Sequence, residues 1–186
     1  NTCICVVGLG YVGLPLAVEF SKHHRVIGFD IDTDRIKDLG NGADKTGEVS
    51  SEVLDNAKRL TFTSETSEID EANIYIVTVP TPVDKFRVPD LKPLENATRM
   101  IASCLSPGDL VIYESTVYPG VTREFCGTIL ENKTGFKISE DIYLGYSPER
   151  INPGDKINTI SNITKITSGC CHESAQIVNK LYSEII

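Results

Sequence analysis

Residues 6–13 read Val-Val-Gly-Leu-Gly-Tyr-Val-Gly, and they join a short apolar run to a helical pattern. A Gly-x-Gly-x-x-Gly sequence that follows a buried strand and opens a helix is typical of a loop that binds the pyrophosphate of a dinucleotide. The first glycine, Gly8, permits a tight turn, and Gly10 lets the backbone approach the phosphates. Gly13 lets the helix pack closely against the strand, so that the helix N–H groups face the phosphates.

An acidic residue ends the next predicted strand. Asp30 lies 22 residues after Gly8, where a carboxylate can accept hydrogen bonds from the adenosine ribose and would repel a 2′-phosphate. The pattern therefore favours NAD over NADP as the cofactor. Two other interpretations stay open: a glycine turn that serves packing alone, with Asp30 or Asp32 as a helix cap, and a site for S-adenosylmethionine. Because Asp32 or Thr33 is better placed to cap the next helix, we expect Asp30 to be free for a ligand.

Strand and helix patterns alternate along the chain. Apolar runs predict strands at residues 3–7, 25–30, 74–79, 110–114 and 142–145, and a sixth strand near residues 165–167. Helical patterns cover residues 12–22, 34–39, 52–59, 92–105, 121–132 and 173–185. This alternation predicts an α/β fold: a doubly wound, mostly parallel Rossmann sheet of about six main strands with helices on both faces. No linker divides the chain, so we expect one domain over residues 1–186.

The composition excludes several classes of protein. The 186 residues carry 18 Lys and Arg against 26 Asp and Glu, a formal charge of −8, which argues against nucleic acid or an anionic membrane as a partner. No apolar run approaches the length of about 20 residues that spans a membrane, and no signal-peptide pattern is visible, so we expect a cytoplasmic protein. The six cysteines form no CxxC pair and no zinc-like cluster, which predicts reduced thiols and no bound metal. A metal or redox site at the adjacent Cys170, Cys171 and His172 is the less favoured interpretation.

Polar, proline-rich loops follow the other strands. Residues 80–84 read PTPVD, residues 115–120 read STVYPG and residues 146–155 read YSPERINPGD. Each loop alone could be a proline-stiffened turn, with Glu149 and Arg150 as an exposed ion pair. In an open parallel sheet, however, ligands bind in a crevice beyond the carboxyl ends of the strands. The sequence therefore places hydroxyl groups, a carboxylate and a guanidinium around one predicted ligand site.

Four motifs together resemble the NAD-binding domain of the UDP-glucose/GDP-mannose dehydrogenase family. They are GLGYVGLP at residues 8–15, VPTPVD at 79–84, ESTVYPG at 114–120 and YSPERINPGD at 146–155, in the family's order. The nearest resemblance is to the branch that oxidises UDP-N-acetylhexosamines for surface polysaccharides. It implies two oxidations, each passing a hydride to NAD, that turn the terminal hydroxymethyl group of the sugar into a carboxylate.

The resemblance also implies roles for individual residues. The residues that match cofactor contacts are Gly8, Gly10, Tyr11, Val12, Gly13, Asp30, Arg35, Thr81 and Thr116. Among these, Asp30 and Arg35 match contacts to the adenosine ribose, and Thr116 matches a threonine that helps to order the catalytic water. Glu149 matches the glutamate that serves as general acid and base in thioester hydrolysis. Glu149, Arg150 and Ile151 match positions that contact the UDP-sugar.

Two catalytic groups of the family have no counterpart in this sequence. The nucleophilic cysteine of the family lies in a Gly-Gly-His-Cys-like motif of a later domain, and its catalytic lysine also lies in a later segment. We therefore expect residues 1–186 to be part of a longer, homodimeric enzyme, and we expect no turnover from this chain alone. A β-hydroxyacid-type dehydrogenase and a stand-alone NAD-binding regulatory module are the alternatives. The intact glycines and Asp30 argue against a scaffold used only for association.

Overall fold

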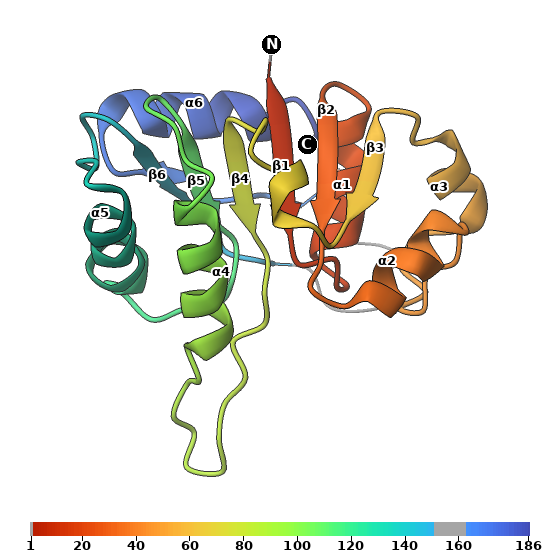
Figure 1. Ribbon diagram of the computed structural model, residues 1–186, viewed down its shortest axis with the longest axis horizontal. Coiled ribbons are helices and arrows are strands. Elements are labelled where there is room, and N and C mark those ends of the chain that lie inside the picture. The colour runs from red at the N-terminus through yellow and green to blue at the C-terminus, as the bar shows by residue number, and fades with distance from the viewer. Residues whose placement is uncertain (1, 151–162) are drawn as a thin grey trace.

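A computed structural model describes residues 2–150 and 163–186 of the chain. In this part of the chain the strands form a seven-stranded sheet in the order β3-β2-β1-β4-β5-β6-β7 (Figure 1). The strands are β1 (Cys3–Val7), β2 (Arg25–Phe29), β3 (Leu60–Thr63), β4 (Ile74–Val77), β5 (Leu110–Tyr113), β6 (Tyr143–Tyr146) and β7 (Ser168–Gly169). Neighbouring strands are parallel except for β6 and β7, which are antiparallel. The fold is the doubly wound, mostly parallel sheet that the alternating pattern predicts.

Burial on both faces explains why the central strands are continuous apolar runs. Every residue of β1, β4 and β5 is buried, as expected for a parallel sheet with helices on both sides. Successive side chains of β1 point to opposite faces, so Ile4 and Val6 join one apolar cluster while Cys5 and Val7 join the other. Each face of the sheet thus has its own core.

Helices cover the two faces of the sheet (Figure 1). They are α1 (Gly13–Ser21), α2 (Thr33–Gly40), α3 (Ser51–Asn56), α4 (Lys92–Ala102), α5 (Thr128–Thr134) and α6 (His172–Tyr182), with a 3₁₀ helix, η1 (Thr66–Glu68), and a π-helix, η2 (Val121–Gly127). Helices α4 and α5 contribute Leu94 and Leu130 to one core, and α1 and α6 contribute Phe20 and Tyr182 to the other. The rings of Phe20 and Tyr182 meet edge to face with centroids 5.5 Å apart, which joins α1 to α6.

The structure differs from the predicted elements in several places. The sequence does not predict strand β3, because only Thr63 of its four residues is buried and Thr61 is exposed. The strand expected near residues 165–167 is instead β7, which has two residues and is antiparallel. The helix expected over residues 52–59 ends at Asn56, and the one expected over residues 121–132 is divided between η2 and α5.

The cysteines are free thiols, and Cys3, Cys5 and Cys126 are buried. Cys171 is the N-cap of α6, and its backbone N–H donates to the Ser174 hydroxyl at 3.1 Å. Within residues 2–150 and 163–186, no group of three or more His, Cys, Asp or Glu is arranged to hold a metal ion. Within the same residues, no helix is long and apolar enough to cross a membrane.

Candidate cofactor-binding site

A cavity lies where the order of the strands reverses. The chain builds β1, β2 and β3 on one side and then returns to place β4 on the other side of β1. Loops at the carboxyl ends of neighbouring strands diverge at such a point. The cavity here has a volume of about 1100 Å³ and is lined by residues after β1, β2, β3, β4 and β5, by α4 and by Glu149. Its position and size suit an extended ligand such as a dinucleotide.

The three glycines after β1 have different surroundings. Gly8 has a φ of 97°, a left-handed backbone conformation that residues with a Cβ rarely adopt. A Cβ added to Gly13 would lie 1.8 Å from the Gly8 carbonyl oxygen and 2.4 Å from Thr78 Oγ1. Gly13 therefore permits the close packing of α1 against the loop. A Cβ added to Gly10 would have no described atom within 4 Å, and Gly10 lines the cavity.

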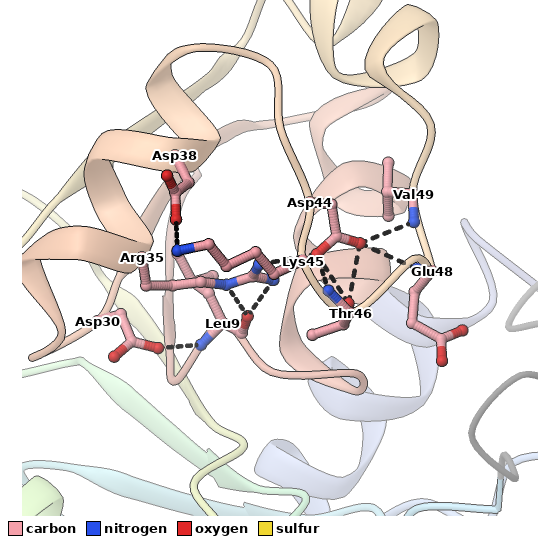
Figure 2. A network of polar contacts seen from close by, with 9 residues as sticks. All are labelled: Leu9, Asp30, Arg35, Asp38, Asp44, Lys45, Thr46, Glu48 and Val49. Carbon is pink, nitrogen blue, oxygen red and sulfur yellow. Dashed lines mark hydrogen bonds and ion pairs between the residues drawn. The ribbon is translucent and has the colours of Figure 1, made fainter.

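The backbone of Leu9 holds the glycine-rich loop in place (Figure 2). Its N–H donates to Asp30 Oδ2 at 2.8 Å, and its carbonyl oxygen accepts hydrogen bonds from Nε and Nη2 of Arg35 at 2.9 and 2.7 Å. Asp30 after β2 therefore holds the N–H group of Leu9, and Arg35 of α2 holds its carbonyl group. Hydrogen bonds of this kind to charged groups are stronger than those between neutral groups.

Asp30 is less free than the sequence suggests. Asp32 is the N-cap of α2, as expected, and accepts hydrogen bonds from the backbone N–H groups of Asp34 and Arg35. The Asp32 N–H in turn donates to Asp30 Oδ1 at 3.0 Å, so both oxygens of Asp30 already accept a backbone hydrogen bond. Because a carboxylate oxygen can accept more than one hydrogen bond, both oxygens can still receive a ribose hydroxyl.

The loop at residues 41–50 holds the Arg35 side chain through an ion pair with Asp44 (Figure 2). Arg35 Nη1 lies 2.7 Å from Asp44 Oδ1, and the Asp44 side chain is 0% exposed. Asp44 also accepts hydrogen bonds from the backbone N–H groups of Thr46, Glu48 and Val49 at 2.9, 3.0 and 3.0 Å. Burial favours the neutral acid, but the hydrogen bonds from Val49 and Thr46 and the Arg35 guanidinium outweigh it and lower the pKa of Asp44.

Hydroxyl side chains connect the strand ends on the other side of the cavity. Thr78 Oγ1, directly after β4, donates to the Gly8 carbonyl at 2.6 Å. Thr81 Oγ1 donates to the Thr116 carbonyl at 2.6 Å. These contacts tie the loop after β4 to the loops after β1 and β5. Thr81 and Thr116, for which the family resemblance implies cofactor contacts, are thus in direct contact.

A buried group of charged residues lies at the end of the cavity near β5. Glu114 follows β5 directly, and its Oε2 is 2.6 Å from Lys165 Nζ. The Tyr182 hydroxyl of α6 donates to Glu114 Oε1. Glu149 Oε2 lies 3.9 Å from Lys165 Nζ, and Glu149 Oε1 accepts a hydrogen bond from the backbone N–H of Arg150 at 2.6 Å. Burial raises the pKa of Glu114 to about 7, although Lys165 and Tyr182 act in the opposite direction.

Most residues with a predicted role in the site line the cavity. They are Gly8, Gly10, Tyr11, Val12, Asp30, Thr81, Thr116 and Glu149. Gly13 and Arg35 do not line it: Gly13 packs against Gly8, and the Arg35 side chain is directed at the Leu9 carbonyl and Asp44. Arg150 is exposed and lies outside the lining, and Ile151 lies outside the described residues.

Several lining residues have no role in the sequence analysis. Ser64 and Thr66 follow β3, so recognition of that strand would have pointed to them. Glu114 belongs to the ESTVYPG motif, but its burial is not visible in the sequence. Lys165 has no local signal, because it meets Glu114 across 51 residues of sequence.

A doubly wound sheet with a glycine-rich first loop and an acid after β2 defines a dinucleotide-binding domain. The profile described as UDP-glucose/GDP-mannose dehydrogenase family, NAD binding domain, matches residues 2–186. The chain belongs to this family and comprises its NAD-binding domain, so the cofactor is NAD.

Individual relatives agree with this assignment. The chain is 53% identical over 183 residues to UDP-N-acetyl-D-glucosamine 6-dehydrogenase of Pseudomonas aeruginosa, a match that covers 98% of this chain and 43% of the relative. It is 48% identical to Protein CapL of Staphylococcus aureus, covering 100% of this chain and 44% of the relative. The solved structure of UDP-D-ManNAc dehydrogenase from Pyrococcus horikoshii superposes with a TM-score of 0.93 at 33% identity and covers 100% of this chain and 45% of that one. The chain therefore spans less than half the length of these relatives.

Proposed function

We propose that residues 1–186 are the cofactor-binding part of an enzyme that oxidises the terminal hydroxymethyl group of a UDP-N-acetylhexosamine to a carboxylate in two NAD-dependent steps. The names of the relatives support the substrate class: two proteins at 53% and 51% identity are UDP-N-acetyl-D-glucosamine 6-dehydrogenases, and one at 35% is a UDP-N-acetyl-D-mannosamine dehydrogenase. The structural observation that carries the proposal is the cavity that joins the glycine-rich loop to Thr116 and Glu149.

The reaction balances without any further reactant. One primary alcohol, one water and two NAD⁺ give one carboxylate, two NADH and three protons. Bound NAD⁺ supplies the acceptor for the hydride. The residues of this chain orient the reactants and move protons, and the cysteine that traps the intermediate aldehyde in the family has no counterpart in residues 1–186.

The cavity offers a place for each part of the cofactor. The open surface at Gly10 and the start of α1 can receive the pyrophosphate, and Asp30 can accept hydrogen bonds from the adenosine ribose. At the other end, Thr116 orders the water that cleaves the thioester and Glu149 removes its proton. Thr81 supports Thr116 through the hydrogen bond to its carbonyl. Arg150 and Ile151 contact the UDP-sugar in this proposal.

The proposal extends to the setting of the enzyme. We place the reaction in the cytoplasm, where NAD and nucleotide sugars are available, and in a homodimer, the state that the family resemblance implies. The formal charge of −8 argues against nucleic acid or an anionic membrane as partner.

Two glycine-to-alanine variants test the cofactor site. Gly10→Ala adds a methyl group where the pyrophosphate would lie, while no described residue obstructs it in the folded chain. Calorimetric titration with NAD should show that the affinity falls about tenfold or more, a loss of about 1.4 kcal/mol or more. Gly40→Ala at the end of α2 is the matched control, because an added Cβ there also has no described atom within 4 Å. Equal NAD affinity in both variants, with both folded by circular dichroism, would show that NAD does not bind beside Gly10 in this cavity.

Turnover is tested separately. With NAD and UDP-N-acetylglucosamine or UDP-N-acetylmannosamine, the 186-residue chain is expected to bind the cofactor and to form no NADH, as followed by absorbance. Rapid NADH formation by this chain would show that its own residues supply the nucleophile.

A further inference from the structure

Lys165 lies between two buried carboxylates at the end of the cavity. Its Nζ is 2.6 Å from Glu114 Oε2 and 3.9 Å from Glu149 Oε2. The side chains are 2% exposed for Lys165, 0% for Glu114 and 10% for Glu149. An ammonium group enclosed in this way is weakly screened by solvent, so its interaction with each carboxylate is strong.

The neighbours of Glu114 fix its side chain. Tyr182 donates to Oε1, and Lys165 donates to Oε2, so both oxygens are engaged from the segment after residue 162. Lys165 Nζ also lies 5.5 Å above the centroid of the Tyr182 ring. Glu114 and Glu149 both line the cavity, and their carboxylates share the Lys165 ammonium, which lies nearer to Glu114.

We propose that Glu114 and Lys165 are positioning residues for Glu149. Lys165 holds the Glu149 carboxylate at the end of the cavity. Glu114 competes with Glu149 for the Lys165 ammonium group and so determines how strongly Lys165 attracts Glu149. This inference rests on the proposed function, which assigns the proton transfer to Glu149. It adds two residues, of which Glu114 lines the cavity, and both act through Glu149.

The arrangement makes the environment of Glu149 sensitive to pH near neutrality. The described groups that face Glu114 are Lys165, Tyr182 and Glu149, and burial raises the pKa of Glu114 to about 7. Above that pH, Glu114 is charged and competes for the Lys165 ammonium. Below it, Glu114 is neutral, and the ammonium is attracted mainly to Glu149. Loss of one proton from Glu114 thus weakens the contact between Lys165 and Glu149.

The test is a titration of the 186-residue chain by carbon NMR with labelled glutamate carboxyl groups, without cofactor or sugar. Glu114→Gln and Glu149→Gln assign the two signals. The Glu149 signal in the wild-type chain should show an inflection at the pH where Glu114 titrates. Glu114→Gln should abolish that inflection. Lys165→Met should make the inflection clearly smaller, because only the direct repulsion between the two carboxylates remains, and should move the Glu114 midpoint upward by about one pH unit or more, because an opposite charge has been removed.

Two further variants separate positioning from packing. Lys165→Arg keeps the positive charge and should restore the coupled inflection, whereas a role in filling space alone would not require the charge. Lys180→Met on α6 removes an exposed lysine of the same segment and should leave both signals unchanged.

A Glu149 signal without an inflection at the Glu114 midpoint in the wild-type chain overturns the proposal, and this result does not depend on how the variants fold. An inflection of undiminished size in folded Lys165→Met overturns it as well. Because neither NAD nor a sugar is present, the outcome is independent of the cofactor titration that tests the proposed function.

Discussion

The carboxylate of Asp30 accepts a hydrogen bond from the backbone N–H of Leu9 at 2.8 Å. The residue expected to recognise the ribose is therefore also part of the loop expected to bind the pyrophosphate. We expect the acid to select the cofactor through its charge, while its oxygens order the loop by accepting backbone hydrogen bonds. These two effects can be separated by substitutions that remove one or both of them.

Asp30→Asn keeps a hydrogen-bond acceptor and removes the negative charge. We expect NAD affinity to fall modestly and NADP affinity to rise relative to it, because a 2′-phosphate is no longer repelled. Asp30→Ala removes acceptor and charge, and should weaken NAD binding about tenfold or more. Calorimetric titrations with both dinucleotides measure the ratio of Kd values. An unchanged ratio in Asp30→Asn would show that this carboxylate does not select the cofactor.

Gly13→Ala should destabilise the fold. The added Cβ would lie 1.8 Å from the Gly8 carbonyl oxygen, so α1 must move away from the loop. We expect a loss of about 3 kcal/mol or more in the free energy of unfolding, measured with urea. Gly40→Ala, which meets no described atom within 4 Å, is the control and should change stability little. Comparable stability of the two variants would contradict the close packing of α1.

Asp44→Asn should destabilise the chain at neutral pH by about 3 kcal/mol, because Arg35 would keep a buried charge without its partner. The folded chain lowers the pKa of Asp44 below its ordinary value of 3.8. The contribution of this carboxylate is therefore present above pH 3.8 and is lost as the pH falls through the lower, folded pKa. Urea denaturation of both proteins from pH 7 downward should show their stabilities converging in acid. The exposed Asp55→Asn is the control, and a constant difference across this range would contradict the prediction.

Glu114→Gln should show the opposite dependence. The pKa of Glu114 is raised from 4.5 to about 7 in the folded chain, so the unfolded chain loses its proton first as the pH rises. The stability of the wild-type chain relative to Glu114→Gln should be greatest below pH 4.5 and fall by about 3 kcal/mol as the pH rises through 7. Urea denaturation between pH 4 and 8 measures this difference, with the exposed Glu52→Gln as control. A rise in relative stability over that range would contradict a raised pKa of Glu114 in the folded chain.

The elements that the sequence predicts well are those with a strong local signal. Strands β1, β4 and β5 are buried on both faces, so their apolar runs are unbroken. Strand β3 is only partly buried and directly follows a helical pattern, and its four residues carry too little signal. The strand β7 forms only through pairing with β6, which no local pattern encodes.

The residues of the candidate site also fall into those that local sequence predicts and those that it does not. Gly8, Gly13 and Asp30 belong to one strand-helix-strand unit, β1-α1-β2, and their spacing is enough to place them. The direction of the Arg35 side chain depends on Asp44, which comes from a loop without a recognisable pattern. Lys165 depends on a partner that is remote in sequence, and the energy of such a pair depends on burial that sequence does not display.

The contacts of Glu114 with Lys165 and Tyr182, across 51 and 68 residues of sequence, also bear on where this domain can be divided. A chain cut after β6 would keep the glycine-rich loop and every strand from β1 to β6. It would also leave a carboxyl group in the interior without the ammonium and the phenol that accompany it. We therefore expect a stable cofactor domain to extend through Tyr182. The final helix is part of that unit, even though the residues expected to bind NAD all precede it.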